Sequence, residues 1–174
     1  MVKKISIAGA VLIVAILVFA ATRPDTFSVE RSTSIKAAPG KIFPLINDFH
    51  QWDAWTPYNK DRVMKKSYSG AASGVGAVSA WDGNRDVGKG SITITESDPP
   101  SKIVMDLQMI KPFNCRNHVE FTLTPTGDGT TVRWAMSGPS TIVSKLMGLF
   151  FNMDKMVGKD FELGLAGLKR FAEK

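Results

Sequence analysis

The segment from Gly83 to Gly90 comes closest in this sequence to a nucleotide-binding motif. It reads GNRDVGKG and so keeps the glycines and the lysine of a phosphate-binding loop. The position that needs a Ser or Thr hydroxyl for magnesium is Gly90, and the residues after it alternate as in a strand instead of starting a helix. We therefore interpret the segment as a hairpin bracketed by glycines.

Nucleophilic catalysis and zinc binding have few candidate residues, because the chain contains one cysteine and two histidines. Cys115 shares strand parity with Val119 and Phe121, which predicts that it faces the apolar side as a small hydrophobe. His118 has the opposite parity, so Cys115 and His118 are expected to point apart. His50 lies beside an aromatic cluster, but no two candidate ligands have a suitable spacing. The sequence predicts no catalytic residue, metal or cofactor.

The carboxylates do not form an acid–base pair either, since Asp106 and Glu120 have outward parity. Asn117 is the polar residue with inward parity in its strand. Its amide could hydrogen-bond a ligand, or satisfy neighbouring backbone near a strand irregularity. Both interpretations stay open.

Composition narrows the class of protein further. The 174 residues fit one domain, and the single cysteine excludes an internal disulfide. Lys and Arg number 22 against 16 Asp and Glu, giving a net charge of +6. The basic residues are spread along the chain without a run of five or six, which is typical of a solvated surface. No nucleic-acid partner is predicted, and the sequence identifies no protein partner.

Residues 5–21 form an apolar run without a charge, preceded by Lys3 and Lys4 and followed by Arg23 and Pro24. As a helix the run would span roughly 26 Å, close to the hydrocarbon thickness of a bilayer. A single-pass anchor and a secretory signal peptide both fit, and the length of the run favours the anchor. The charge bias places the N-terminus in the cytoplasm. We expect residues 1–24 to hold the chain in the cytoplasmic (inner) membrane, with residues 25–174 as an extracytoplasmic domain.

The rest of the chain predicts an α+β domain. Segments 26–36, 62–69, 75–81, 88–97, 102–110, 113–125 and 130–137 alternate between apolar and polar residues or lie between turn signals, and we expect seven antiparallel strands. Segments 40–48 and 49–55 follow the first strand as two short helices. After Pro139 the period changes to 3.6, which predicts one amphipathic helix of some 30 residues covering the apolar face of the sheet.

This order of elements resembles the helix-grip fold of the START and pollen-allergen (SRPBCC) superfamily, in particular its polyketide cyclase/dehydrase-like branch. The resemblance covers roughly residues 26–173. The motifs that carry it are Ala37-Ala38-Pro39, Trp52-Asp53-Ala54-Trp55-Thr56-Pro57, Gly74-Val75-Gly76, Trp81-Asp82-Gly83-Asn84, Pro99-Pro100, Lys111-Pro112-Phe113 and the terminal run from Met153 to Lys169. It implies a curved sheet of about seven strands wrapped on a long C-terminal helix.

The resemblance also implies a cavity for a hydrophobic molecule between the sheet and the C-terminal helix. The expected lining residues are apolar side chains, methionines and the inward asparagine: Trp52, Trp55, Trp81, Met105, Met109, Asn117, Phe121, Trp134, Met136, Met153 and Phe161. A membrane-anchored binding module for a lipid or polyketide-like compound is the first hypothesis. The alternatives are a cyclase or dehydratase acting on such a compound, and a partner-binding domain without an open cavity.

Overall fold

A computed structural model describes residues 16, 18, 19, 21–58, 61, 63–85, 87–140, 145, 146 and 153–174. Most of the apolar N-terminal run lies outside these residues, and so does the anchor predicted there. Within the described part of the chain, none of the helices has the length and apolar character needed to cross a membrane.

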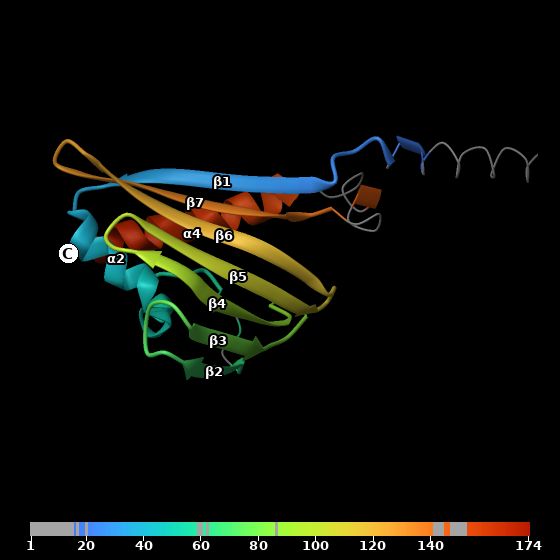
Figure 1. Ribbon diagram of the computed structural model, residues 1–174, viewed down its shortest axis with the longest axis horizontal. Helices are drawn as coiled ribbons and strands as arrows, with labels where there is room; N and C mark the ends of the chain where they lie inside the picture. The colour runs from blue at the N-terminus through green and yellow to red at the C-terminus, as the bar shows by residue number, and fades with distance from the viewer. Residues whose placement is uncertain are drawn as a thin grey trace, which may run out of the picture.

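Seven antiparallel strands form one curved sheet (Figure 1). The strands are β1 (Thr26–Ile35), β2 (Lys65–Gly70), β3 (Ala77–Asp82), β4 (Lys89–Asp98), β5 (Lys102–Lys111), β6 (Cys115–Thr126) and β7 (Gly129–Pro139). Their order across the sheet is β1-β7-β6-β5-β4-β3-β2, so the first and last strands pair and the others follow as a meander. The predicted number of strands and the antiparallel pairing are confirmed; β2 begins at Lys65, later than its pattern suggested.

Alternation along most strands separates an inner, apolar face from an outer, polar one, whereas β2 is exposed along its whole length. In β7, Val132, Trp134 and Met136 are buried, whereas Arg133 and Ser137 are only half-buried. Adjacent strands continue the inner face in register, because Val119 lies opposite Met136 and Met105 opposite Val119. A one-residue slip would turn the apolar side chains to water, which fixes the pairing.

Two short helices cover part of the inner face after β1. The α-helix α2 (Pro39–Asn47) has proline at its first turn, where no hydrogen bond is lost, and buries Ile42, Phe43 and Ile46. The 3-10 helix η1 (Phe49–Ala54) follows directly, and the Asp48 carboxylate caps it by accepting from the His50 backbone N–H at 2.9 Å. Both helices confirm the sequence-based expectation.

The C-terminal helix α4 (Met153–Ala172) lies along β1 and β7 on the inner side of the sheet. It has 20 described residues, which form the C-terminal part of the helix of some 30 residues expected from the apolar periodicity. The other positions of that predicted helix, 141–144 and 147–152, lie outside the described residues. Phe161, Leu165 and Leu168 form the buried stripe of α4, as its 3.6-residue period predicts.

Glycines let α4 approach its neighbours closely. A Cβ at Gly164 would stand 2.7 Å from Cζ3 of Trp134, and one at Gly167 would overlap the carbonyl oxygen of Trp55. Each glycine lowers helix propensity by about 1 kcal/mol relative to alanine, a cost offset here by close packing. Gly164 and Gly167 therefore permit close packing of α4 against Trp134 and Trp55.

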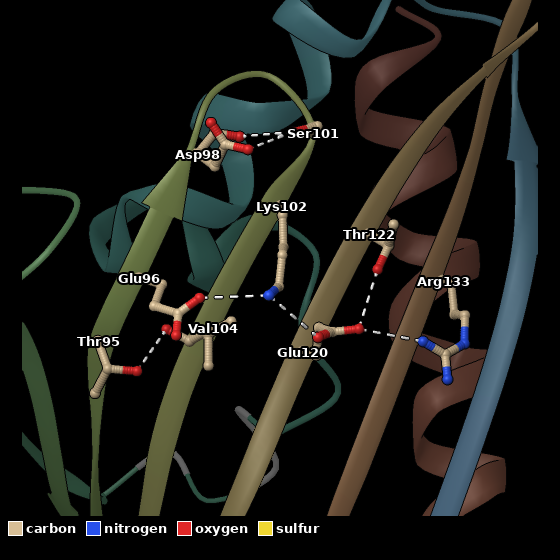
Figure 2. Close-up of polar contacts among 9 residues, drawn as sticks. All are labelled: Thr95, Glu96, Asp98, Ser101, Lys102, Val104, Glu120, Thr122 and Arg133. Carbon is tan, nitrogen blue, oxygen red and sulfur yellow. Dashed lines mark hydrogen bonds and ion pairs between the residues drawn. The ribbon is translucent and has the colours of Figure 1, made fainter.

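The outer face of the sheet carries a ladder of opposite charges (Figure 2). Lys102 lies between Glu96 and Glu120, at 3.3 and 3.7 Å from their carboxylate oxygens, and Arg133 bridges Glu120 at 3.3 Å. Arg133 also pairs with Glu30 on β1. Glu120, predicted to face outward, therefore stabilises strand pairing instead of facing a ligand.

Candidate functional site

The inner face divides into two halves along the strand direction. The half near α2 is tightly packed by five aromatic rings from η1, the segment after it, the sheet and α4. The rings of Trp134 and Phe161 stack at 4.1 Å and 11°, and those of Phe121 and Trp134 lie 4.8 Å apart. Trp52 and Trp55 complete the cluster, each with its ring nitrogen donating to a backbone carbonyl of α2. This half is a hydrophobic core.

The other half lies toward the edge at which β1 begins, and its side chains are less covered. Half-buried apolar side chains from four strands face inward here: Phe27, Trp81, Leu107, Met109 and Cys115. Register relates them, since Met109 pairs with Cys115 on one side and Gly90 on the other, and Gly90 pairs with Trp81. Together with Asn117 we call them the open half of the inner face.

Asn117 lies at the centre of this open half, opposite Leu107. The residue is 7% exposed, and its Nδ2 contacts Cys115 Sγ at 3.8 Å. Its Oδ1 is buried without a hydrogen-bond partner among the described residues, and it lies so close to Gly138 that a Cβ there would overlap it. A buried amide oxygen without a donor costs roughly 1–3 kcal/mol. A ligand hydroxyl or N–H reaching this amide would recover that cost.

Trp134 supplies a second buried polar atom without a partner. Its Nε1 donates no hydrogen bond within the described residues, although the residue is buried on the inner face. The Tyr58 ring meets Trp134 edge-on at 6.4 Å. Burial, together with the Asp160 carboxylate, raises the pKa of Tyr58 well above its ordinary value, so the phenol stays protonated at neutral pH. These groups can donate hydrogen bonds.

Arg31 is a charged residue on the inner side of β1 and fastens α4 to the sheet. Its Nε lies 2.7 Å from Glu162, its Nη1 lies 2.9 Å from Asp154, and its guanidinium covers Gly158. The hydrogen bonds that Arg31 donates to Asp154 and Glu162 raise the pKa of Arg31, and the bond to Asp154 lowers the pKa of that carboxylate. Arg31 therefore positions the helix and exchanges no proton.

A groove of about 780 Å³ runs across β1, β7, β6 and β5. Its lining includes outward residues such as Ser28, Asp106, His118 and Ser137. Arg116 pairs with Asp106 at 2.6 Å in this groove. The lining also includes Met105 and Asn117, so the groove shares these two residues with the predicted site.

The predicted site residues are distributed over both halves of the inner face. Trp55, Met105, Phe121, Trp134, Met136 and Phe161 are buried in the core, and Trp52 packs against it. Trp81, Met109 and Asn117 lie in the open half. Met153 begins α4, and its side chain is outside the described set. That these residues line a ligand cavity stays a prediction.

The expected lining did not include Phe27, Leu107 or Arg31. Leu107 has the same parity as Met105 and Met109, and the alternation in β5 predicts that it faces the apolar side. Phe27 and Arg31 share parity with buried Val29. No local signal shows the role of Arg31, because its acidic partners lie 123 and 131 residues later in the chain.

His118 and Cys115 lie on opposite faces of β6, as their parity predicts. His118 is exposed on the outer face, and Cys115 shares the inner parity of Asn117. His50 is exposed, with its ring 4.3 Å from that of Tyr68 and its Nδ1 2.9 Å from Asp48. Within the described residues, no group of three or more His, Cys, Asp or Glu side chains could hold a metal ion.

A curved antiparallel sheet closed by a C-terminal helix, with two short helices after the first strand, defines the helix-grip fold. Residues 26–173 match the family described as polyketide cyclase / dehydrase and lipid transport, and the chain belongs to this family. No curated protein shows a significant match to the sequence.

Solved structures share the fold at low sequence identity. The Aha1 dimer from Colwellia psychrerythraea is 17% identical with a TM-score of 0.61, covering 84% of this chain and 96% of that one. Ara h 8.0201 is 12% identical with a TM-score of 0.60, covering 84% and 97%. The di-domain ARO/CYC StfQ from the steffimycin biosynthetic pathway is 13% identical with a TM-score of 0.64, covering 85% of this chain and 51% of StfQ. At these identities the similarity shows the fold alone.

Proposed function

We propose that this chain is a membrane-anchored module that binds a hydrophobic small molecule, a lipid or a polyketide-like compound, on the open half of the inner face. The observation that carries the proposal is the buried Asn117 amide, whose oxygen has no donor, surrounded by half-buried apolar side chains. A ligand covering them gains about 25 cal/mol for each Å² of apolar surface removed from water. The family match supports a hydrophobic ligand.

Binding accounts for this surface better than catalysis does. An amide holds a ligand by hydrogen bonds but has no proton to transfer near neutral pH. Arg31 stays charged and paired, and Tyr58 stays protonated. A cyclase-type activity would need an acid or base that titrates near the ligand. The pKa values of Arg31 and Tyr58 are instead raised further from neutrality.

The membrane part of the proposal is supported by the sequence. Residues 5–21 are apolar and Lys3 and Lys4 precede them, and under the positive-inside rule this charge bias supports a domain outside the cytoplasm. The domain begins at β1, directly after this segment. A tethered module of this kind would hold its ligand close to the bilayer surface.

Native mass spectrometry tests ligand binding directly. Residues 25–174 contain the whole buried core of the described chain, from Val29 to Ala172, and are suitable for the experiment. We expect a hydrophobic adduct of defined mass, co-purified or taken up from a lipid mixture. Leu107→Glu should abolish uptake, whereas Leu163→Glu on the exposed side of α4 should not. Asn117→Leu, which removes the amide without adding charge, should retain apolar ligands and weaken oxygenated ones. Uptake equal in all variants, or none in the wild type, would contradict the proposal.

A further inference from the structure

One end of each of the seven strands lies along the same edge of the sheet, the edge that runs across the strands. Because all neighbouring strands are antiparallel, the starts of β1, β2, β4 and β6 lie beside the ends of β3, β5 and β7. The chain reaches β1 at this edge, which is on the right in Figure 1. We call it the N-terminal edge. α2 and the C-terminus lie at the opposite end of the molecule.

Large apolar side chains are exposed at the N-terminal edge. Ile110 and Phe113, in and just after the end of β5, are 47% and 54% exposed. Val63, two residues before β2, is 85% exposed. Single exposed apolar residues are common, but these three lie at strand ends along one side of the sheet. Apolar groups gathered in this way are typical of an interaction surface.

Basic side chains surround these apolar residues. Lys65 begins β2, Lys89 begins β4 and Lys111 ends β5, and all three act on Asp82 at the end of β3. The hydrogen bond from Lys89, at 2.7 Å, lowers the pKa of Asp82, and Lys111 and Lys65 lower it further. One carboxylate thus lies among three lysines, so the edge carries excess positive charge.

Arg85 and Arg116 extend the basic surface on both sides. Arg85 is exposed in the β3–β4 connection. Arg116, the second residue of β6, has a 73% exposed side chain although it pairs with Asp106. Asp61 and Asp25 are further carboxylates at this edge. Asp61 accepts hydrogen bonds from the backbone N–H groups of Val63 and Asn84, and Asp25, just before β1, pairs with Lys145 at 2.6 Å.

We propose that the N-terminal edge docks on the surface of an anionic lipid bilayer. Lys65, Lys89 and Lys111 would contact lipid phosphates, and Ile110, Phe113 and Val63 would enter the interfacial region. Charge complementarity favours an anionic lipid surface over a neutral one. The position of the edge favours a bilayer over another partner, since the apolar segment 5–21 joins the domain at this same edge.

Docking of this edge would orient the open half of the inner face toward the lipid. Met109 and Cys115, its outermost pair, lie on the strands of the hairpin that carries Ile110 and Phe113. A hydrophobic molecule would then pass between bilayer and protein with little exposure to water. This consequence rests on the proposed ligand-binding function, whereas the docking rests only on the proposed membrane anchor.

The test uses the full chain incorporated into vesicles of phosphatidylcholine with and without phosphatidylglycerol. A fluorophore is attached at Phe113→Cys, in a Cys115→Ser background, and lipids spin-labelled near the headgroup serve as quenchers. Asp128→Cys, in the β6–β7 turn at the opposite end, is the matched position. We expect quenching at residue 113 that increases with phosphatidylglycerol, and little quenching at residue 128.

Charge reversal distinguishes docking from simple tethering. Lys65→Glu with Lys111→Glu should reduce the docked fraction, by about fivefold in the equilibrium constant for each lysine removed. Lys41→Glu with Lys174→Glu makes the same charge change at the opposite end and should have little effect. Equal quenching at residues 113 and 128, or equal effects of the two pairs, would overturn the proposal. Failure of ligand uptake would leave this result unchanged, so the two proposals can fail separately.

Discussion

The side-chain oxygen of Asn117 lies against the backbone of Gly138 on the neighbouring strand, with no room for a Cβ between them. The amide is therefore held in place by packing rather than by hydrogen bonds to its oxygen. Such a group is costly in an apolar environment and rigid enough to orient a ligand. The proposed binding of a ligand at Asn117 depends on this packing against Gly138.

Gly138→Ala should destabilise the domain by about 1–3 kcal/mol, because the new methyl group overlaps Asn117 Oδ1. In an Asn117→Ala background the same substitution should cost clearly less. A double-mutant cycle from urea unfolding measures this coupling, and combination with Leu163→Ala on the exposed side of α4 provides the additive control. Additive effects of the Gly138 and Asn117 substitutions would show that the two residues do not interact as described.

Phe161→Ala should destabilise the domain by about 3–5 kcal/mol, since it removes a buried ring stacked on Trp134 and leaves a cavity beside it. Leu163→Ala, two positions along α4 and 49% exposed, should change stability by less than about 0.5 kcal/mol. Thermal or urea unfolding of both variants provides the comparison. Similar losses in the two would mean that α4 does not pack through Phe161.

Gly164→Ala should be destabilising despite the better helix propensity of alanine. Its Cβ would stand 2.7 Å from the Trp134 ring and 3.1 Å from Pro57, and the overlap should outweigh the gain of about 1 kcal/mol in propensity. Gly40→Ala in α2 meets nothing within 4 Å and should be neutral or stabilising. The two substitutions should change the free energy of unfolding in opposite directions. Stabilisation by both would contradict the close approach of α4 to Trp134.

Stability should depend on pH through the Arg31–Asp154 pair. The hydrogen bond from Arg31 holds the pKa of Asp154 below its ordinary value of 3.8. Because the folded pKa is the lower one, this contribution is present above about that pH and is lost as the pH falls through the folded pKa. Arg31→Met should therefore lose less stability than the wild type between about pH 5 and pH 2.

Urea midpoints of the wild type and of Arg31→Met across that range measure the effect. Asp82→Asn, which removes a separate ion pair at the N-terminal edge, should leave the difference between them unchanged. Parallel pH profiles for the wild type and Arg31→Met would mean that the pair contributes nothing.

The sheet could be predicted from the sequence because alternation is a local property. The inward positions of Asn117 and Phe121 followed from the period of two, and register carried that order across the sheet. The C-terminal helix is confirmed from Met153 to Ala172, and its predicted extension before Met153 stays a prediction because most of those residues lie outside the described part of the chain. The order of elements predicted the fold class well.

The division of the inner face into a packed and an open half could not be predicted. It depends on which strands α4 covers, and Arg31 fixes α4 along β1 through acids far away in the chain. By strand parity Trp134 and Met109 both face inward. The structure separates them, because Trp134 stacks against Phe161 whereas Met109 lies in the open half. Tertiary contacts therefore decide which inward residues form core and which are left to meet a ligand.

Methyl NMR of the methionines tests whether a ligand binds on the open half of the inner face. The domain carrying labelled methionine methyl groups is titrated with a spin-labelled fatty acid and with a spin-labelled polycyclic phenol. We predict saturable broadening of Met109 in the open half and weaker effects on buried Met136, with Met156 on the exposed side of α4 unaffected. No broadening with either probe, or equal broadening of Met109 and Met156, would contradict ligand binding on the open half of the inner face.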